Sequence, residues 1–371
     1  MRQFRIASSE HDDEAQMVAE CLQQLGQVSG LANLGFLYCS DFLAERIERI
    51  LHRLKDALPG VRWIGTVGMG ICAGDREIYD QAALAIMVGE FPADSFQLLR
   101  EFKSNLDQVG IFGSEQPMGS RFAFIHADPT DTHTAQWLEQ LANEPAIAFV
   151  NGGVSSSRGA NPRIAGTVVG TGLSGVIFNA QVSVTTDHTQ GCQPIGPVHH
   201  VTKANSNIAI TLDNQPALEV LKTDVGEVLS KDLRRLGGYI FAALPIQGSD
   251  TGDYLVRNLI GIDKEQQLVA VGDRLQSGQR LIFCRRDGNS AREDMVKMLL
   301  RLKKRVGERL IRGGIYVTCL GRGRHQFGEN SEELKLITQY LGEFPLIGYF
   351  ANGEIYNGRL YGYTGVLTLF L

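Results

Sequence analysis

The pattern of apolar and polar residues along this chain contains the same series of strand-like and helix-like segments three times. Each copy begins with an apolar run typical of a buried strand and continues with apolar residues at helical spacing. It then reaches a second short apolar run that closes on glycine. The first runs are residues 34–39, 121–126 and 314–319, the helical stretches are 42–58, 134–141 and 331–341, and the second runs are 61–65, 146–152 and 346–348. Longer strands close the copies at residues 82–88, 174–184 and 365–371.

A strand, a helix and a second strand form a βαβ unit, in which the two strands are parallel and the crossover is right-handed. The closing strands look antiparallel, so we predict an α/β (mixed α+β) fold whose mixed sheets are covered by helices. We interpret the repetition as two related lobes that face one another across a cleft, which is a natural place for a small molecule. Ordinary α/β alternation without duplication is the alternative interpretation.

The middle of the chain has a different pattern. Residues 216–236 have helical spacing, and four strand-like runs follow at residues 239–244, 254–260, 268–271 and 280–284. Their short separations predict an antiparallel meander. A long helix over residues 291–310 then leads into the third copy of the repeat.

The composition is that of a folded protein, because 43% of the 371 residues are hydrophobic and 21% are charged. The net charge of −5 argues against broad binding to nucleic acid, and the one basic run, residues 297–312, reads as the solvated face of a helix. No apolar segment has the length of a membrane span. The six cysteines form no Cys-x-x-Cys pair, which is typical of buried thiols in a reducing compartment. We therefore expect a cytoplasmic protein.

The familiar catalytic and cofactor motifs are either absent or lie among residues that do not suit their function. Residues 170–175 match G-x-G-x-x-G, but a strand pattern follows where a dinucleotide site needs a helix. Neighbouring His199 and His200 would point to opposite faces of a strand, and His126 and His133 flank a polar loop that suits a helix cap. No Gly-x-Ser-x-Gly elbow occurs. We therefore expect no metal site and no classical serine or zinc enzyme.

Two segments rich in glycine and proline are the most distinctive local features. Residues 191–197 read Gly-Cys-Gln-Pro-Ile-Gly-Pro, and residues 344–355 run from Phe-Pro-Leu-Ile-Gly to Asn-Gly-Glu-Ile. Together with further pieces in the same order, they resemble the FIST family, named for F-box proteins and intracellular signal transduction. The further pieces are residues 63–65, 70–71, 74–78, 152–153, 172–175, 201–204, 216–221 and 319–323.

The resemblance implies a FIST N-terminal domain over residues 1–213 and a FIST C-terminal domain over residues 214–371. It also implies a non-enzymatic sensory module that binds a small ligand, with amino acids as the proposed class, and that signals through a partner. Because the chain leaves no room for an output domain, the partner would be a separate protein of the kinase, cyclase or chemoreceptor type. The sequence indicates neither the ligand nor the oligomeric state.

Candidate ligand-binding residues lie in the glycine-rich segments. Glycine lets backbone N–H groups approach a ligand, Arg322 could clamp a carboxylate with its fork of donors, and Glu354 could accept from an ammonium group. Alternatively, Arg322 and Glu354 satisfy each other or nearby backbone groups, and Cys192 reads as a packed thiol. The candidates are Gly191, Cys192, Gly196, Arg322, Gly348, Gly353 and Glu354.

Two other functions stay open. A subset of the family are haem proteins that sense nitric oxide, and His188, His199, His200 and His325 lie beside the family motifs as candidate axial ligands. Because the chain has no Cys-x-x-Cys-His motif, haem would be bound non-covalently. Our first expectation is nevertheless that the protein has no cofactor. The other alternative is a protein–protein adaptor that binds no ligand.

Overall fold

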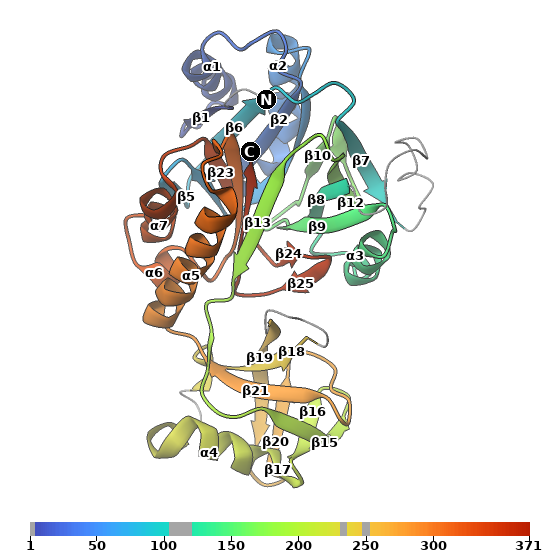
Figure 1. Cartoon of the computed structure of the whole chain (residues 1–371), viewed down its shortest axis with the longest axis vertical. Helices are drawn as coiled ribbons and strands as arrows, with labels where there is room; N and C mark the ends of the chain where they lie inside the picture. The colour runs from blue at the N-terminus through green and yellow to red at the C-terminus, as the bar shows by residue number, and fades with distance from the viewer. Residues whose placement is uncertain (1–3, 104–120, 231–235, 247–252) are drawn as a thin grey trace. The chain divides into compact units, whose positions relative to one another are not determined.

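The computed structural model describes residues 4–103, 121–230, 236–246 and 253–371. The chain divides into two compact units, one formed by the residues up to Thr189 together with Met295–Leu371, and the other by Gln190–Asp294 (Figure 1). Helix α5 (Gly288–Val306) begins in the second unit, and its residues from Met295 onwards belong to the first.

Three six-stranded mixed sheets make up the first unit, and they share one plan. In each sheet, counted from one edge, the second strand is antiparallel to the first and the third to the second, whereas the fourth is parallel to the third. A hairpin then pairs with the fourth strand and extends the sheet. The first sheet has the order β1 (Arg5–Ser9), β6 (Leu84–Gly89), β2 (Leu34–Ser40), β3 (Arg62–Gly68), β10 (Arg163–Ala165) and β11 (Val168–Val169). The second, read in the same direction, is β7 (Phe96–Phe102), β12 (Leu173–Phe178), β8 (Arg121–Ala127), β9 (Ile147–Val154), β24 (Glu354–Tyr356) and β25 (Arg359–Tyr361). The third is β13 (Val184–Thr189), β26 (Gly365–Phe370), β22 (Gly313–Cys319), β23 (Leu346–Ala351), β4 (Gly70–Ala73) and β5 (Arg76–Tyr79).

Each repeat supplies its hairpin to a neighbouring sheet. The β4–β5 hairpin follows β3 of the first sheet in sequence but pairs with β23 of the third. In the same way β10–β11 follows β9 and pairs with β3, and β24–β25 follows β23 and pairs with β9. The exchange runs around all three sheets, so it ties them into one cyclic assembly.

The three parallel strand pairs depend on a glycine at the same position. A Cβ atom built on Gly65, Gly152 or Gly348 would lie 1.8 Å from a backbone oxygen of the neighbouring central strand. These three glycines end the second apolar runs that recur in the sequence. No other residue type permits so close an approach of two backbones.

Helices cover the outer faces of the sheets (Figure 1). Helix α1 (Glu14–Leu25) begins at Asp13, which accepts hydrogen bonds from the N–H groups of Ala15 and Gln16 as an N-cap. It packs with α2 (Ile47–Ala57) on the first sheet, and α3 (Thr134–Ala142) packs on the second. The short α6 (Arg324–Phe327) and then α7 (Glu332–Leu341) connect β22 to β23.

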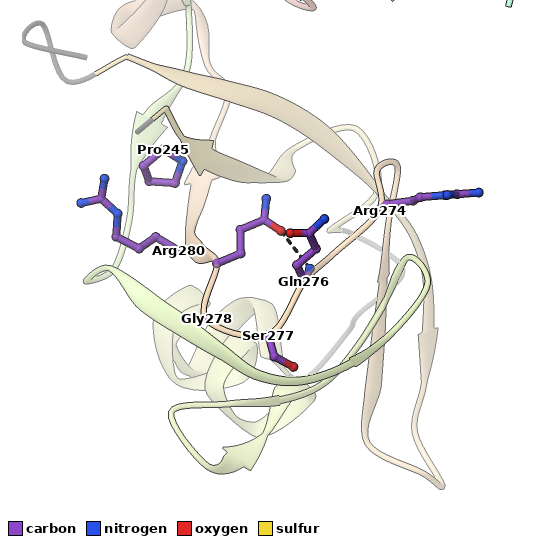
Figure 2. A pocket seen from close by; sticks show the side chains of 7 residues that line it. Pro245, Arg274, Gln276, Ser277, Gly278 and Arg280 are labelled. Carbon is purple, nitrogen blue, oxygen red and sulfur yellow. Dashed lines mark hydrogen bonds between the residues drawn. The ribbon is translucent and has the colours of Figure 1, made fainter. Parts of the chain in front are cut away.

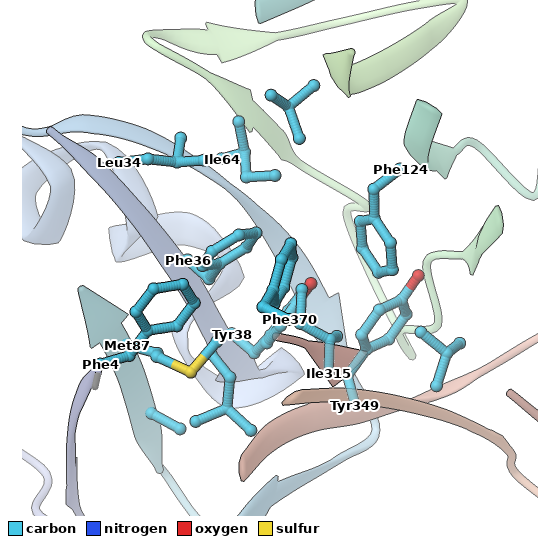
Figure 3. Close-up of a cluster of buried hydrophobic side chains, with 14 of the residues drawn as sticks. Phe4, Leu34, Phe36, Tyr38, Ile64, Met87, Phe124, Ile315, Tyr349 and Phe370 are labelled. Carbon is cyan, nitrogen blue, oxygen red and sulfur yellow. The ribbon is translucent and has the colours of Figure 1, made fainter. Parts of the chain in front are cut away.

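The inner faces of the three sheets share one hydrophobic core. Figure 3 shows side chains from all three sheets converging there, including Phe36 of β2, Phe124 of β8 and Ile315 of β22. These three residues are inaccessible to solvent. The burial of large aromatic and aliphatic groups along this junction is the main force that holds the sheets together.

The second unit is a closed antiparallel barrel. Around it run β18 (Ile240–Pro245), β19 (Tyr254–Asp263), β20 (Leu268–Val271), β16 (Ile208–Leu212), β15 (His199–Asn205) and β21 (Arg280–Arg285), and β21 pairs back to β18. Short strands β14 (Gln193–Pro194) and β17 (Gln215–Pro216) pair with β21 and β16. Helix α4 (Ala217–Ser230) packs Leu218 and Leu221 into the barrel core.

The structure confirms the mixed α/β fold and all three strand–helix–strand units. It refines the prediction of two related lobes, because the three related sheets all lie in the first unit. Of the predicted meander, β18, β19 and β20 are antiparallel neighbours, whereas β21 pairs with β18 and β15 instead of β20, and β15 and β16 complete the barrel. The end of the helix predicted over residues 216–236 lies outside the described residues. Within the described ranges, no helix is long and apolar enough to cross a membrane.

Candidate functional site

Equivalent positions on the inner faces of the three sheets carry different residues, and several of these residues are ionisable. We name Gly65, Gly152 and Gly348 the close-approach glycines. The residues that follow them directly are Thr66, Gly153 and Tyr349. Across the parallel pairs these residues stand beside Tyr38, His126 and Val317. Towards the hairpins they pair with Arg163, Glu354 and Ile71. We name the ionisable residues of this set, Tyr38, His126, Arg163, Tyr349 and Glu354, the junction cluster.

His126 is the buried base of the junction cluster. Its Nε2 shares a 3.1 Å hydrogen bond with the hydroxyl of Tyr38, and the Tyr38 ring stacks on Tyr349 with centroids 4.9 Å apart. Burial, with a smaller contribution from the Arg163 cation, lowers the pKa of His126 to about 3. The imidazole is therefore neutral at physiological pH. Its Nδ1 atom has no hydrogen-bond partner among the described residues.

Glu354 is a buried carboxyl on the hairpin that extends the second sheet. Its Oε2 accepts hydrogen bonds from the Thr364 backbone N–H at 3.0 Å and the Thr364 hydroxyl at 2.6 Å. Burial raises the pKa of Glu354 to about 8, so the neutral carboxylic acid predominates at pH 7. In the described chain, Oε1 is buried without a partner.

The hydroxyl of Tyr349 lies beside Gly153, the residue that pairs with Glu354. A Cβ atom on Gly153 would come within 2.8 Å of this hydroxyl, so the missing side chain makes room for it. The hydroxyl oxygen is buried, and no described residue hydrogen-bonds to it.

Arg163 contributes a cation that is inaccessible to solvent. Its Nη1 donates to Oδ2 of Asp128 at 2.7 Å, and the N–H and hydroxyl of Thr130 hold the other oxygen of that carboxylate. The Nε and Nη2 atoms of Arg163 have no hydrogen-bond partner within the described ranges.

The junction cluster thus concentrates unpaired polar atoms in the middle of an apolar core. Buried polar groups in proteins are nearly always hydrogen-bonded, and an unpaired one costs about 1–3 kcal/mol. Four side chains of one cluster with unpaired atoms therefore need an explanation. Water or a ligand that supplies the missing partners would provide one.

Arg322 and Glu354, predicted as the two ends of a ligand clamp, have different partners in the structure. The guanidinium of Arg322 is buried against the carboxylate of Glu333, with Nε and Nη2 each 2.7 Å from Oε1. Glu333 also accepts from the Gly323 N–H at 2.8 Å and the Tyr316 hydroxyl at 2.7 Å. This network has the form of the structural alternative considered for Arg322, with Glu333 in place of Glu354.

The predicted glycines have local structural roles. Gly348 is one of the three close-approach glycines, and a Cβ atom on Gly353 would lie 2.9 Å from Leu360. In the barrel, Gly191 has a positive φ of 64°. A Cβ atom on Gly196 would lie 2.2 Å from the Asp224 carboxylate. The buried Cys192 accepts a 2.7 Å hydrogen bond from the Tyr254 hydroxyl at its backbone oxygen.

The four histidines predicted as haem ligands differ in environment. His199 is held at both ring nitrogens, by Asp213 at 2.7 Å and Asp224 at 2.9 Å. His200 and His325 are exposed. His188 is buried, and its ring lies 4.1 Å from that of Tyr356, centroid to centroid.

The barrel carries a polar pocket of about 550 Å³ at its surface (Figure 2). A hydrogen bond of 3.0 Å from the Gln276 N–H to the Gln279 side chain shapes its rim. Figure 2 shows that the side chains of Arg274 and Arg280 point away from each other, so they do not form a joint anion site.

Of the junction cluster, the sequence analysis had singled out only Glu354 as a ligand-binding candidate. Tyr38 and Tyr349 read as ordinary apolar strand residues, His126 as part of a polar loop, and Arg163 had no motif around it. The recurring glycine that ends each second strand is the signal that could have located them, because the cluster lies one step beyond it in each repeat.

Comparison with known proteins gives a consistent result over nearly the whole chain. The family model described as the FIST N domain matches residues 33–215, and that described as the FIST C domain matches residues 217–357. An uncharacterized protein of Mycobacterium tuberculosis is 28% identical over 380 residues, which cover 96% of this chain and 95% of the relative. An uncharacterized protein of Mycobacterium bovis is 28% identical over 359 residues, which cover 91% and 90%. The predicted domain boundary after residue 213 falls close to the junction of the two matches and inside the second compact unit.

Proposed function

Because the chain belongs to the FIST family, whose domains are linked to sensing in signal transduction, we propose that it is a non-enzymatic sensor that binds a small polar ligand at the junction cluster. The signal would pass to a separate protein of the kinase, cyclase or chemoreceptor type. Ligand binding between the strands of three sheets would couple the ligand to the packing of all three.

The observation that carries this proposal is the set of unpaired buried atoms in the cluster. They are His126 Nδ1, Tyr349 Oη, Glu354 Oε1, and Arg163 Nε and Nη2. A ligand that pairs with several of them would regain the desolvation free energy that the unliganded protein loses. The cluster offers both neutral and charged groups, which suits a ligand with more than one kind of polar atom.

The direct test is native mass spectrometry of freshly purified protein, compared with the denatured chain. Excess mass that is lost on denaturation would reveal a bound ligand. A panel of small polar metabolites would then be screened for thermal stabilisation of the protein, since a ligand that binds only the folded state raises the melting temperature. Bare protein that no compound stabilises would contradict the proposal and favour an adaptor.

Tyr349→Phe separates ligand binding at the cluster from binding elsewhere. The substitution removes the unpaired hydroxyl and leaves the ring, so the fold should persist while ligand-dependent stabilisation falls. Tyr340→Phe on α7 is the matched control, because its hydroxyl is not part of the cluster. Equal stabilisation of both variants by the ligand would place the ligand elsewhere.

Haem ligation is the alternative for which His188, His199, His200 and His325 were predicted, and it stays a prediction. An absorption spectrum after haem titration checks it. A Soret band that disappears in one His→Ala variant would support a haem sensor. A protein that stays colourless would contradict it.

A further inference from the structure

One edge of the Arg163 guanidinium is occupied and another is unpaired. Asp128 takes a single hydrogen bond from Nη1, whereas Nε and Nη2, which lie side by side on the guanidinium plane, have no partner among the described residues. The whole side chain is inaccessible to solvent. An exposed arginine would satisfy this edge with bulk water, but a buried one needs a bound partner.

The spacing of two parallel N–H groups on this edge matches the two oxygens of a carboxylate. We propose that the junction cluster recognises a ligand that carries a carboxylate, which binds side-on to Nε and Nη2 of Arg163. This inference rests on the proposed sensor function, and it assigns the chemical class of the ligand.

The rest of the cluster is compatible with one added anion. His126 carries no charge, so Arg163 is the cation of the cluster, and Glu354 in its neutral form adds no negative charge. Burial lowers the pKa of His126 to about 3 and raises that of Glu354 to about 8. The Asp128 carboxylate is held by Thr130 and reaches the guanidinium through one oxygen only.

The repeat also fixes the stoichiometry. The positions equivalent to Arg163 in the other two sheets are held by Glu354 and Ile71. Only one of the three hairpins carries a guanidinium at this position, so the chain should bind one carboxylate in one orientation. A ligand of this class would therefore bind with 1:1 stoichiometry despite the threefold repeat.

The experiment compares carboxylates with their uncharged amides on the full chain. Acetate, succinate and benzoate, each beside the corresponding amide, are titrated by calorimetry and by thermal shift, with chloride and nitrate as further anions. We expect one carboxylate per chain and at least about tenfold weaker binding of the amide, because a hydrogen bond to a charged group is stronger than one to a neutral group.

Arg163→Lys and Arg163→Met test the residue itself. Both remove the side-on edge, and Arg163→Lys keeps the charge, so we expect about tenfold to hundredfold weaker carboxylate binding in each. Arg158→Lys is the control, because the Arg158 guanidinium is already bound to Asp41 at 2.7 and 2.6 Å. Circular dichroism checks that each variant is folded.

A second measurement avoids variants whose fold fails. In protein labelled with 15N-arginine, the Nε signal that is missing from the Arg163→Lys spectrum belongs to Arg163, and a carboxylate should shift it in the wild type. Carboxylates that bind Arg163→Lys as tightly as wild type, or chloride that binds as well as acetate, would overturn the inference. An Nε signal that no carboxylate moves would also overturn it, and the unpaired edge would then hold only water.

The two proposals fail separately. If native mass spectrometry recovers a ligand without a carboxylate, the sensor function stands and the assignment to Arg163 is wrong. If neither a co-purified molecule nor any tested compound binds, the sensor function itself is wrong.

Discussion

Removal of the Glu333 carboxylate should be among the most damaging single changes in the first unit. Glu333 and Arg322 are both inaccessible to solvent, and the carboxylate accepts from the guanidinium, the Gly323 N–H and the Tyr316 hydroxyl within 2.8 Å. Glu333→Gln keeps the shape of the side chain but removes the carboxylate that pairs with the buried Arg322 cation. Loss of one member of a buried ion pair costs about 3–5 kcal/mol, which is a large part of a typical unfolding free energy.

The assay is urea unfolding followed by tryptophan fluorescence. Trp63 and Trp137 are the two tryptophans of the chain, and both lie in the first unit, so the signal reports that unit. Glu332→Gln is the control on the same helix turn, because its ion pair with Lys335 is exposed and long at 3.5 Å and is worth at most about 1 kcal/mol.

The double variant Arg322→Met/Glu333→Gln tests the cause of the loss. Since it removes the cation together with its partner carboxylate, it should be less destabilised than the sum of its two single variants. A Glu333→Gln protein within about 1 kcal/mol of wild type would refute the reasoning. So would strictly additive effects in the double variant.

Three further predictions concern the barrel and the junction cluster. Gly196→Ala should destabilise the barrel by about 1–3 kcal/mol, because its Cβ atom would lie 2.2 Å from the Asp224 carboxylate, and the loss should shrink in an Asp224→Ala background. Burial lowers the pKa of His199, but hydrogen bonding to Asp213 and Asp224 outweighs burial and raises this pKa above its ordinary value. The contribution of His199 to stability should therefore be complete below about pH 6.5 and fade as the pH rises through the folded-state pKa. Hydrogen-exchange mass spectrometry of barrel peptides in urea, on wild type and His199→Gln, checks both predictions, and a stability gap that widens with pH would contradict the second. Burial raises the pKa of Glu354 to about 8, so the folded state holds a proton that the unfolded chain releases from about pH 4.5. Wild type should therefore lose stability relative to Glu354→Gln as the pH rises from about 4.5 to about 8. The difference in urea midpoint by tryptophan fluorescence measures it, and a difference that is constant with pH would show that Glu354 titrates normally.

The strand–helix–strand units were predictable from the repeated local pattern, because the spacing of apolar residues that distinguishes strands from helices involves only residues close together in the sequence. The hairpin exchange was not predictable, since nothing near β4 in the sequence indicates that it pairs with β23, more than two hundred residues away. The barrel was predicted only as a meander, because its closure depends on β15 and β16, which lie on the far side of α4 in the sequence.

The candidate site was harder to predict than the fold for the same reason. Arg322 stands between two glycines, which made it look available to a ligand, but Glu333 reaches it from the start of α7 and occupies its donors. His126 and Arg163 are separated by a strand, a helix and a loop, and only the sheet registers bring them into one cluster. Burial also reverses the ordinary protonation expected of Glu354 at neutral pH and keeps His126 neutral far into the acid range, and a sequence does not display burial.

The threefold repeat separates structural requirements from functional ones within a single chain. Where the backbone geometry demands one residue, all three repeats supply it: Gly65, Gly152 and Gly348 each meet a backbone oxygen of the neighbouring strand. One step further along the strands the fold makes no such demand, since threonine, glycine and tyrosine are all accommodated there. The hairpins facing these positions carry an isoleucine, an arginine and a glutamate, although packing alone would be satisfied by apolar residues in all three. Two buried ionisable groups in place of apolar ones cost stability, and their bonds to Asp128 and Thr364 still leave Arg163 Nε and Nη2 and Glu354 Oε1 without partners among the described residues. That unmatched cost is the reason to look for the ligand at the junction cluster.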